Sequence, residues 1–268
     1  MMINKRILVS CALFMLLFSC SIDDGGGVDI PLKDGSGKVV IEGYVTDEDG
    51  PYEIRVSKSL GITNGSNDYP VITNAKVVLT DNHGQTETLV YDATEKVYTT
   101  TNFHTKEGDT YTLSVTVDGK EYKATSTMPK LVEIDNVEQE KDPVTEGNIL
   151  VSVGFTDPST LGNRYVFRSQ VGSKGKAVYN VFSDQLDNGE ELSFSLLSNY
   201  FLKKNDTVVV EMRSVDTPIF DYFRVLPNSS ADNPDGISIP ANPVSNISNG
   251  ALGYFSAHSV STGYIIIQ

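Results

Sequence analysis

Hydrophobic and polar residues alternate along much of the chain after residue 37, which is the period of half-buried β-strands. The segment 110–117 (TYTLSVTV) places every second residue, from Tyr111 to Val117, on one apolar face. The segments 39–46 (VVIEGYVT) and 52–57 (YEIRVS) follow the same rule. Turn signals, DEDGP before Tyr52 and an Asp-Gly pair after Val117, separate neighbouring strands. The pattern therefore predicts antiparallel hairpins.

A second set of strand-like segments follows residue 131 and surrounds one helical pattern. Between residues 217 and 226 the apolar residues recur at helical spacing, with Asp216 or Thr217 available as a cap and Pro218 suited to the first turn. We expect Pro227 to end this helix. Two long polar stretches without a period, 61–74 and 228–253, predict loops that either bind a partner or are mobile.

Together these patterns predict an all-β protein in two parts. Residues 38–130 are expected to form an antiparallel β-sandwich of the immunoglobulin or transthyretin type. Residues 131–268 are expected to form a second β-sandwich-like domain that carries the short helix 217–226 and the loop 228–253.

The first twenty residues have the pattern of a lipoprotein signal. Lys5 and Arg6 precede an apolar run, 7–18, that is too short to span a bilayer, and the sequence LFSC ends at Cys20. This pattern predicts a signal peptide over 1–19 and acylation of Cys20, because attached acyl chains hold a protein firmly on a membrane.

The residues directly after Cys20 indicate where the anchored protein faces. Ser21, Asp23 and Asp24 resemble the surface-export signal of Bacteroidetes lipoproteins, although an acidic pair can also simply begin a solvated linker. The glycine-rich stretch within 20–37 predicts a flexible tether. We therefore expect an outer-membrane protein that faces the cell exterior.

The composition of the chain argues against several classes of function. The formal net charge of −14 opposes binding to nucleic acid. Both cysteines lie in the first twenty residues, so the body has no thiol nucleophile and no cysteine metal ligand. The three histidines lack metal-ligand spacing, and no G-x-S-x-G motif occurs. We therefore expect neither an enzyme nor a cofactor.

Two groups of polar residues are candidates for binding. The acids near glycine are weak calcium candidates, because hard oxygen ligands suit that ion, but they also suit ordinary turns. These acids are Asp47, Asp49, Asp232 and Asp235. The long loop 228–253 is the candidate binding loop, and its asparagines can either contact a ligand or bond the local backbone. Its candidate residues are Asn228, Asp232, Asp235, Asn246 and Asn249.

Three segments carry a family resemblance. They are VVIEGYVTDEDGPYEIRVSKS (39–59), DTPIFDYFRVLP (216–227) and NPVSNISNGALGYFSAHSV (242–260). Together they resemble the Bacteroidetes lipoproteins known as domain of unknown function 4249. The resemblance implies an accessory protein, because genes of this family commonly accompany TonB-dependent outer-membrane transporters. It implies no catalytic residues.

The sequence therefore leads to two main hypotheses about function, and a degraded or cryptic hydrolase is a further alternative. The first is a surface-exposed, non-enzymatic lipoprotein that helps a TonB-dependent transporter to capture its substrate. The second is an adhesin-like or structural β-sandwich module that binds glycan or protein at the cell surface. An exposed aromatic platform near the loops would favour glycan as the ligand.

Overall fold

The computed structural model describes residues 37–61, 69–173, 175–184, 189–197, 201–229 and 243–268. All of them belong to one compact unit, Gly35–Gln268. The residues before it, including Cys20, Ser21, Asp23 and Asp24, lie outside the described part.

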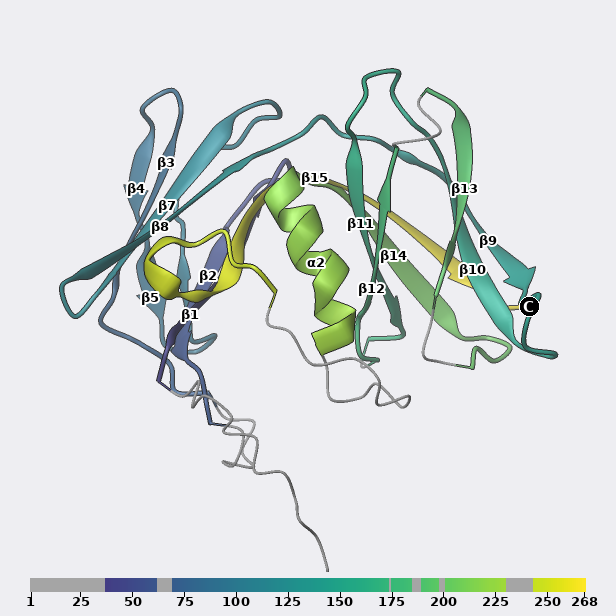
Figure 1. Ribbon diagram of the computed structural model, residues 1–268, viewed down its shortest axis with the longest axis horizontal. Coiled ribbons are helices and arrows are strands. Elements are labelled where there is room, and N and C mark those ends of the chain that lie inside the picture. Colours follow the sequence, from purple (N-terminus) through teal and green to yellow (C-terminus); the bar gives the residue numbers. More distant parts are fainter. Residues whose placement is uncertain (1–36, 62–68, 174, 185–188, 198–200, 230–242) are drawn as a thin grey trace, which may run out of the picture. The chain divides into compact units, whose positions relative to one another are not determined.

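The described residues of this unit form three β-sheets (Figure 1). The largest has eight strands in the order β12-β11-β14-β15-β1-β2-β6-β5. Its strands are β1 (Val39–Thr46), β2 (Glu53–Lys58), β5 (Val90–Asp92), β6 (Val97–Thr99), β11 (Arg164–Val171), β12 (Val178–Ser183), β14 (Thr207–Ser214) and β15 (Leu252–Ile266). A four-stranded sheet, β4-β3-β7-β8, contains β3 (Lys76–Asp81), β4 (Thr86–Thr88), β7 (Thr110–Val117) and β8 (Lys120–Thr127). A three-stranded sheet, β13-β10-β9, contains β9 (Ile134–Lys141), β10 (Ile149–Thr156) and β13 (Glu191–Leu196).

The four-stranded sheet encloses the first hydrophobic core together with one half of the large sheet. Ile41 and Ile54 of the large sheet are fully buried in this core with Leu79, Tyr111 and Leu113. The alternation in β7 is as predicted, because Tyr111 to Val117 bury every second side chain. The three-stranded sheet encloses a second core with the other half of the large sheet, around Phe155, Tyr165, Phe167 and Met212. The predicted all-β sandwich fold is thus confirmed.

The last strand, β15, belongs to both sandwiches. Its first half pairs in parallel with β1, from Val40 opposite Leu252 to Thr46 opposite His258. Its second half pairs antiparallel with β14, and Figure 1 shows it running from one sandwich into the other. The division predicted at residue 130 assigns all of 131–268 to the second part. The structure differs, because Phe255 and Ala257 of this strand are buried in the first core.

The α-helix of the described residues, α2 (Thr217–Ser229), covers the face of the large sheet that points away from the second core. Ile219 and Phe223 pack on Val166 and Tyr254, whereas the neighbours of Val166 on β11 point into the second core. The helix extends three residues beyond the predicted end at 226, so Pro227 lies in its last turn. Within the described residues, no helix is long and apolar enough to cross a membrane.

Candidate functional site

A groove of about 490 Å³ lies between α2 and the strands β1 and β2, and we call it the α2 groove. Strand β1 contributes Val40 and Glu42, and strand β2 contributes Arg55 and Ser57. These side chains line the groove because they alternate with the core residues of the same strands, and successive strand residues point to opposite faces.

Both long loops predicted from the sequence contribute residues to this groove. Tyr69 and Val71 come from the end of the first loop, and Pro243 comes from the second. They face Tyr222 and Leu226 of α2 across the same space. The fold therefore brings together two segments that are more than a hundred residues apart in the sequence.

Lys96 completes the charged lining from the turn between β5 and β6. Its backbone φ of 58° lies in the left-handed region, which lysine rarely adopts. The side chain of Asp92 holds this turn by accepting hydrogen bonds from the backbone N–H groups of Thr94 and Glu95, at 2.7 and 3.3 Å. Backbone strain of this kind gathers at functional sites.

The charged side chains of the groove have unused hydrogen-bonding capacity. Glu42 and Arg55 lie directly opposite each other in the β1–β2 register. Within the described part of the chain, neither of them forms a side-chain hydrogen bond or an ion pair, and neither does Lys96. These groups are thus available to a ligand.

The carboxylate of Glu42 also acts on the nearby phenol of Tyr222. Burial, and then the negative charge of Glu42, raise the pKa of Tyr222 to about 12. The phenol is therefore neutral at physiological pH and keeps its proton for hydrogen bonding.

A second cavity, of about 530 Å³, lies beside the N-terminus of α2. Two of its polar side chains, Asp216 and Arg164, already form hydrogen bonds within the protein. Asp216 accepts hydrogen bonds from the hydroxyl of Ser126 at 2.8 Å and from the backbone N–H of Ile219 at 3.2 Å. Arg164 donates from Nη1 to the carbonyl of Gly162 at 2.6 Å. The two cavities are similar in size, and the unpaired charges make the α2 groove the better candidate.

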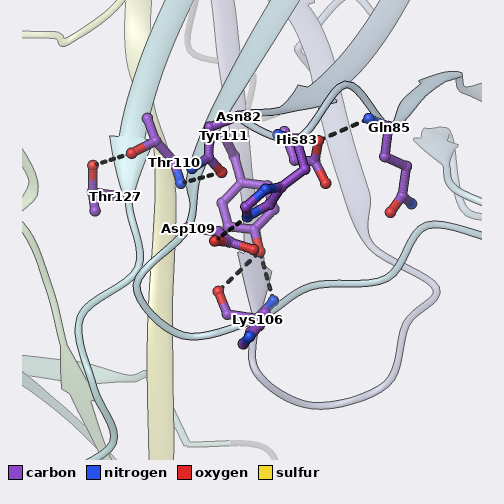
Figure 2. A network of polar contacts seen from close by, with 9 residues as sticks. Asn82, His83, Gln85, Lys106, Asp109, Thr110, Tyr111 and Thr127 are labelled. Atoms are coloured by element: carbon purple, nitrogen blue, oxygen red, sulfur yellow. Dashed lines mark hydrogen bonds and ion pairs between the residues drawn. The ribbon is translucent and has the colours of Figure 1, made fainter.

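A third polar cluster lies in the first sandwich, where Nε2 of His83 is 2.8 Å from Oδ1 of Asp109 (Figure 2). Beside it, the backbone N–H of Thr110 donates to Oδ1 of Asn82 at 3.2 Å. Both contacts join the turn between β3 and β4 to the segment that leads into β7. The cluster therefore has a structural explanation.

The structure gives a structural role to Asn246 and Asn249 of the candidate binding loop. Asn246 donates from Nδ2 to the carbonyl of Phe255 at 2.7 Å and accepts from its backbone N–H at 3.0 Å. Asn249 donates from Nδ2 to the carbonyl of Glu121 at 2.7 Å. These contacts fasten the segment before β15 to the first sandwich.

Other predicted site residues lie elsewhere or outside the described part. The backbone of Asn228 belongs to α2 rather than to a loop. Asp232 and Asp235 lie outside the described residues. The predicted loop 228–253 is shorter than expected, since α2 ends at Ser229 and β15 begins at Leu252.

The calcium candidates of the first hairpin do not form a cluster. Oδ1 of Asp47 accepts a hydrogen bond from the backbone N–H of Val260 at 2.9 Å, and burial raises the pKa of this carboxyl group. Asp49 is exposed. Among the described residues, no group of three or more His, Cys, Asp or Glu side chains could hold a metal ion.

Sequence reasoning missed the residues that line the α2 groove. Glu42 and Arg55 occupy the ordinary polar positions of alternating strands, so nothing in the pattern separates them from other exposed charges. The signal that could have found part of the site is the long loop 61–74, which contains Tyr69.

Comparisons with known proteins identify a family and two solved structures of low similarity. The family model described as "Domain of unknown function (DUF4249)" matches residues 27–263. No curated protein matches the chain. A solved segment of two fibronectin type-III domains from chicken tenascin is 10% identical, with 69% of this chain and 93% of that chain covered and a TM-score of 0.23. The chicken interferon gamma receptor alpha chain is 7% identical, with 67% and 88% covered and a TM-score of 0.21.

Proposed function

This chain belongs to the DUF4249 family, and we propose that it is a non-enzymatic lipoprotein on the outer surface of the outer membrane that captures a substrate for a TonB-dependent transporter. The α2 groove is the proposed capture site. The observation that carries the proposal is the set of unpaired charges on Glu42, Arg55 and Lys96 around a groove of about 490 Å³. Ligand sites of small molecules commonly have volumes of about 300–1,000 Å³ and a few such polar groups.

The lining of the groove favours capture over hydrolysis. Glycosidases use two carboxylates that flank the bond to be cleaved. Among the described residues that line the groove, Glu42 is the one carboxylate. A ligand in this groove would be held and released without bond cleavage.

Anchoring and orientation rest on the N-terminal pattern. Cys20 is the proposed acylation site, and Ser21, Asp23 and Asp24 are the proposed export signal. The association with a transporter rests on the family resemblance.

Affinity purification of the intact, acylated protein in mild detergent tests the transporter association. We expect a TonB-dependent transporter to co-purify, and we expect less of it with a Cys20→Ala variant, which lacks the anchor. If a surface polymer co-purifies without any transporter, the transport proposal is wrong and the adhesin-like alternative is favoured.

Protease treatment of whole cells tests the orientation. We expect the wild-type protein to be cleaved, and a variant with Asp23→Ala and Asp24→Ala to be protected because it stays on the periplasmic side. Equal cleavage of both proteins would refute the role of the two aspartates.

A further inference from the structure

Strand β1, which contributes Val40 and Glu42 to the α2 groove, has no free hydrogen-bonding edge for a ligand. Strand β1 lies between β15 and β2 along its whole lining segment, with Val40 opposite both Leu252 and Ser57. One common way to bind an extended peptide is to add it as a strand to an open sheet edge. On the β1 side of the groove, recognition therefore depends on side chains.

The charged side chains suit a ligand with many hydroxyl groups. The guanidinium group of Arg55 carries five N–H donors in a planar fork, and the carboxylate of Glu42 accepts through two oxygens. Each of these planar groups can bond two neighbouring hydroxyls at once. Since Glu42 and Arg55 are opposite in register and unpaired, one ligand can meet a donor and an acceptor side by side.

Aromatic and aliphatic side chains line the same groove. Tyr69 is 55% exposed although it is a large hydrophobic residue, and Tyr222 lines the groove from α2. Val71 and Leu226 add aliphatic surface. A ligand matching this lining needs apolar C–H faces that can stack on a ring, together with polar edges.

Sugar rings combine these two properties, and we propose that the α2 groove binds a short oligosaccharide. Tyr69 stacks on a sugar face, while Arg55 and Glu42 bond its hydroxyls. A purely apolar ligand would bury the two charges without partners, which is costly. A polyphosphate is disfavoured by the net charge of −14. This inference rests on the proposed function, since it names the class of substrate that the capture site takes.

Isothermal titration calorimetry of the full lipoprotein in detergent tests the inference. The probes are maltotetraose, cellotetraose, xylotetraose, chitotetraose and tetragalacturonate, with tetraalanine as the peptide comparison. We expect at least one sugar to bind and tetraalanine not to bind. If no sugar in this panel binds, or if the peptide alone binds, the inference is overturned.

Two variants locate the binding to the groove. We expect Tyr69→Ala and Arg55→Ala each to weaken sugar binding roughly tenfold, because each loses a stacking surface or a pair of hydrogen bonds. Tyr264→Ala is the matched control, since Tyr264 is 69% exposed and does not line the groove. Equal weakening by the control variant would refute the assignment of the site.

The failure of this inference is distinguishable from the failure of the proposed function. If a transporter co-purifies while no sugar binds, the capture function stands with another class of substrate. If a sugar binds while no transporter co-purifies, the groove is a glycan site of an adhesin-like protein.

Discussion

A close backbone contact between β1 and β15 predicts a large effect of adding a single methyl group at Gly253. Gly253 lies opposite Ile41 in the parallel pair and has a φ of +90°. A Cβ atom at Gly253 would lie 2.0 Å from the carbonyl oxygen of Ile41 and 2.8 Å from its carbonyl carbon. Since both contacts are with backbone, no rotation of a side chain can relieve them. Gly253→Ala must therefore push the two strands apart.

The matched control for this substitution is Gly250→Ala. Gly250 has a similar φ of +76°, but a Cβ atom there would meet nothing within 4 Å. The control therefore carries only the backbone strain, about 1–3 kcal/mol. Gly253→Ala adds the loss of about two strand hydrogen bonds, at about 1 kcal/mol each. We expect the free energies of unfolding of the two variants to differ by about 2 kcal/mol.

Thermal and urea unfolding followed by circular dichroism measure this difference, because the chain has no tryptophan for fluorescence. For a unit of this size, 2 kcal/mol corresponds to a difference in Tm of roughly 4–8 °C between the variants. If Gly253→Ala is no less stable than Gly250→Ala, the parallel pairing of β1 with β15 described above is wrong.

Three further substitutions test single contacts. Asn246→Ala removes both hydrogen bonds to the backbone of Phe255 and should lower the free energy of unfolding by about 1–3 kcal/mol in urea titrations; a loss below about 0.5 kcal/mol would contradict the bridging role. Burial, and then the charge of Arg213, hold the pKa of His258 well below its usual 6.5, so the wild type should lose stability as the pH falls below about 6.5. In His258→Gln, the Tm from thermal unfolding should fall less steeply below pH 6.5 than in the wild type. An equally steep fall would refute the assignment of this pH dependence to His258. Burial raises the pKa of Asp216 above its usual 3.8, so the ionised group destabilises the fold at neutral pH and this cost disappears on acidification towards 3.8. The stability lost in Asp216→Asn should consequently be larger at about pH 4 than at about pH 7, and a pH-independent loss would contradict this explanation.

The sequence predicted the hairpins of the first sandwich well, because their determinants are local. The alternation in 110–117 and the pair Asp118-Gly119 are enough to define β7, the turn and β8, which the structure contains as Thr110–Val117 and Lys120–Thr127. The start of the helix also has a local determinant, since Asp216 accepts a hydrogen bond from the backbone N–H of Ile219. The predicted end of the helix differs from the observed one by three residues, because a proline can kink a helix instead of ending it.

The α2 groove could not be predicted in the same way. Its residues are surface positions of separate strands, and nothing local distinguishes Arg55 from Glu53, which is exposed on the same strand. What distinguishes them is the position of α2, whose apolar face packs on Tyr254 and so encloses the space beside β1. The groove therefore exists only through the arrangement of α2, β1 and β2 in the folded chain.

The alternation of side chains and the turn residues were sufficient to specify an all-β chain with one helix, because strand period and turn chemistry act between neighbours in the sequence. The pairing of β1 with β15 depends instead on contacts between residues more than two hundred positions apart, such as the hydrogen bond from Val260 to Asp47. No local pattern encodes such a pair, since any strand with an apolar face can pair its backbone N–H and C=O groups with those of β1. Burial of Phe255 in the first core and packing of Tyr254 under α2 select this pairing, and with it they join the two sandwiches and form the groove.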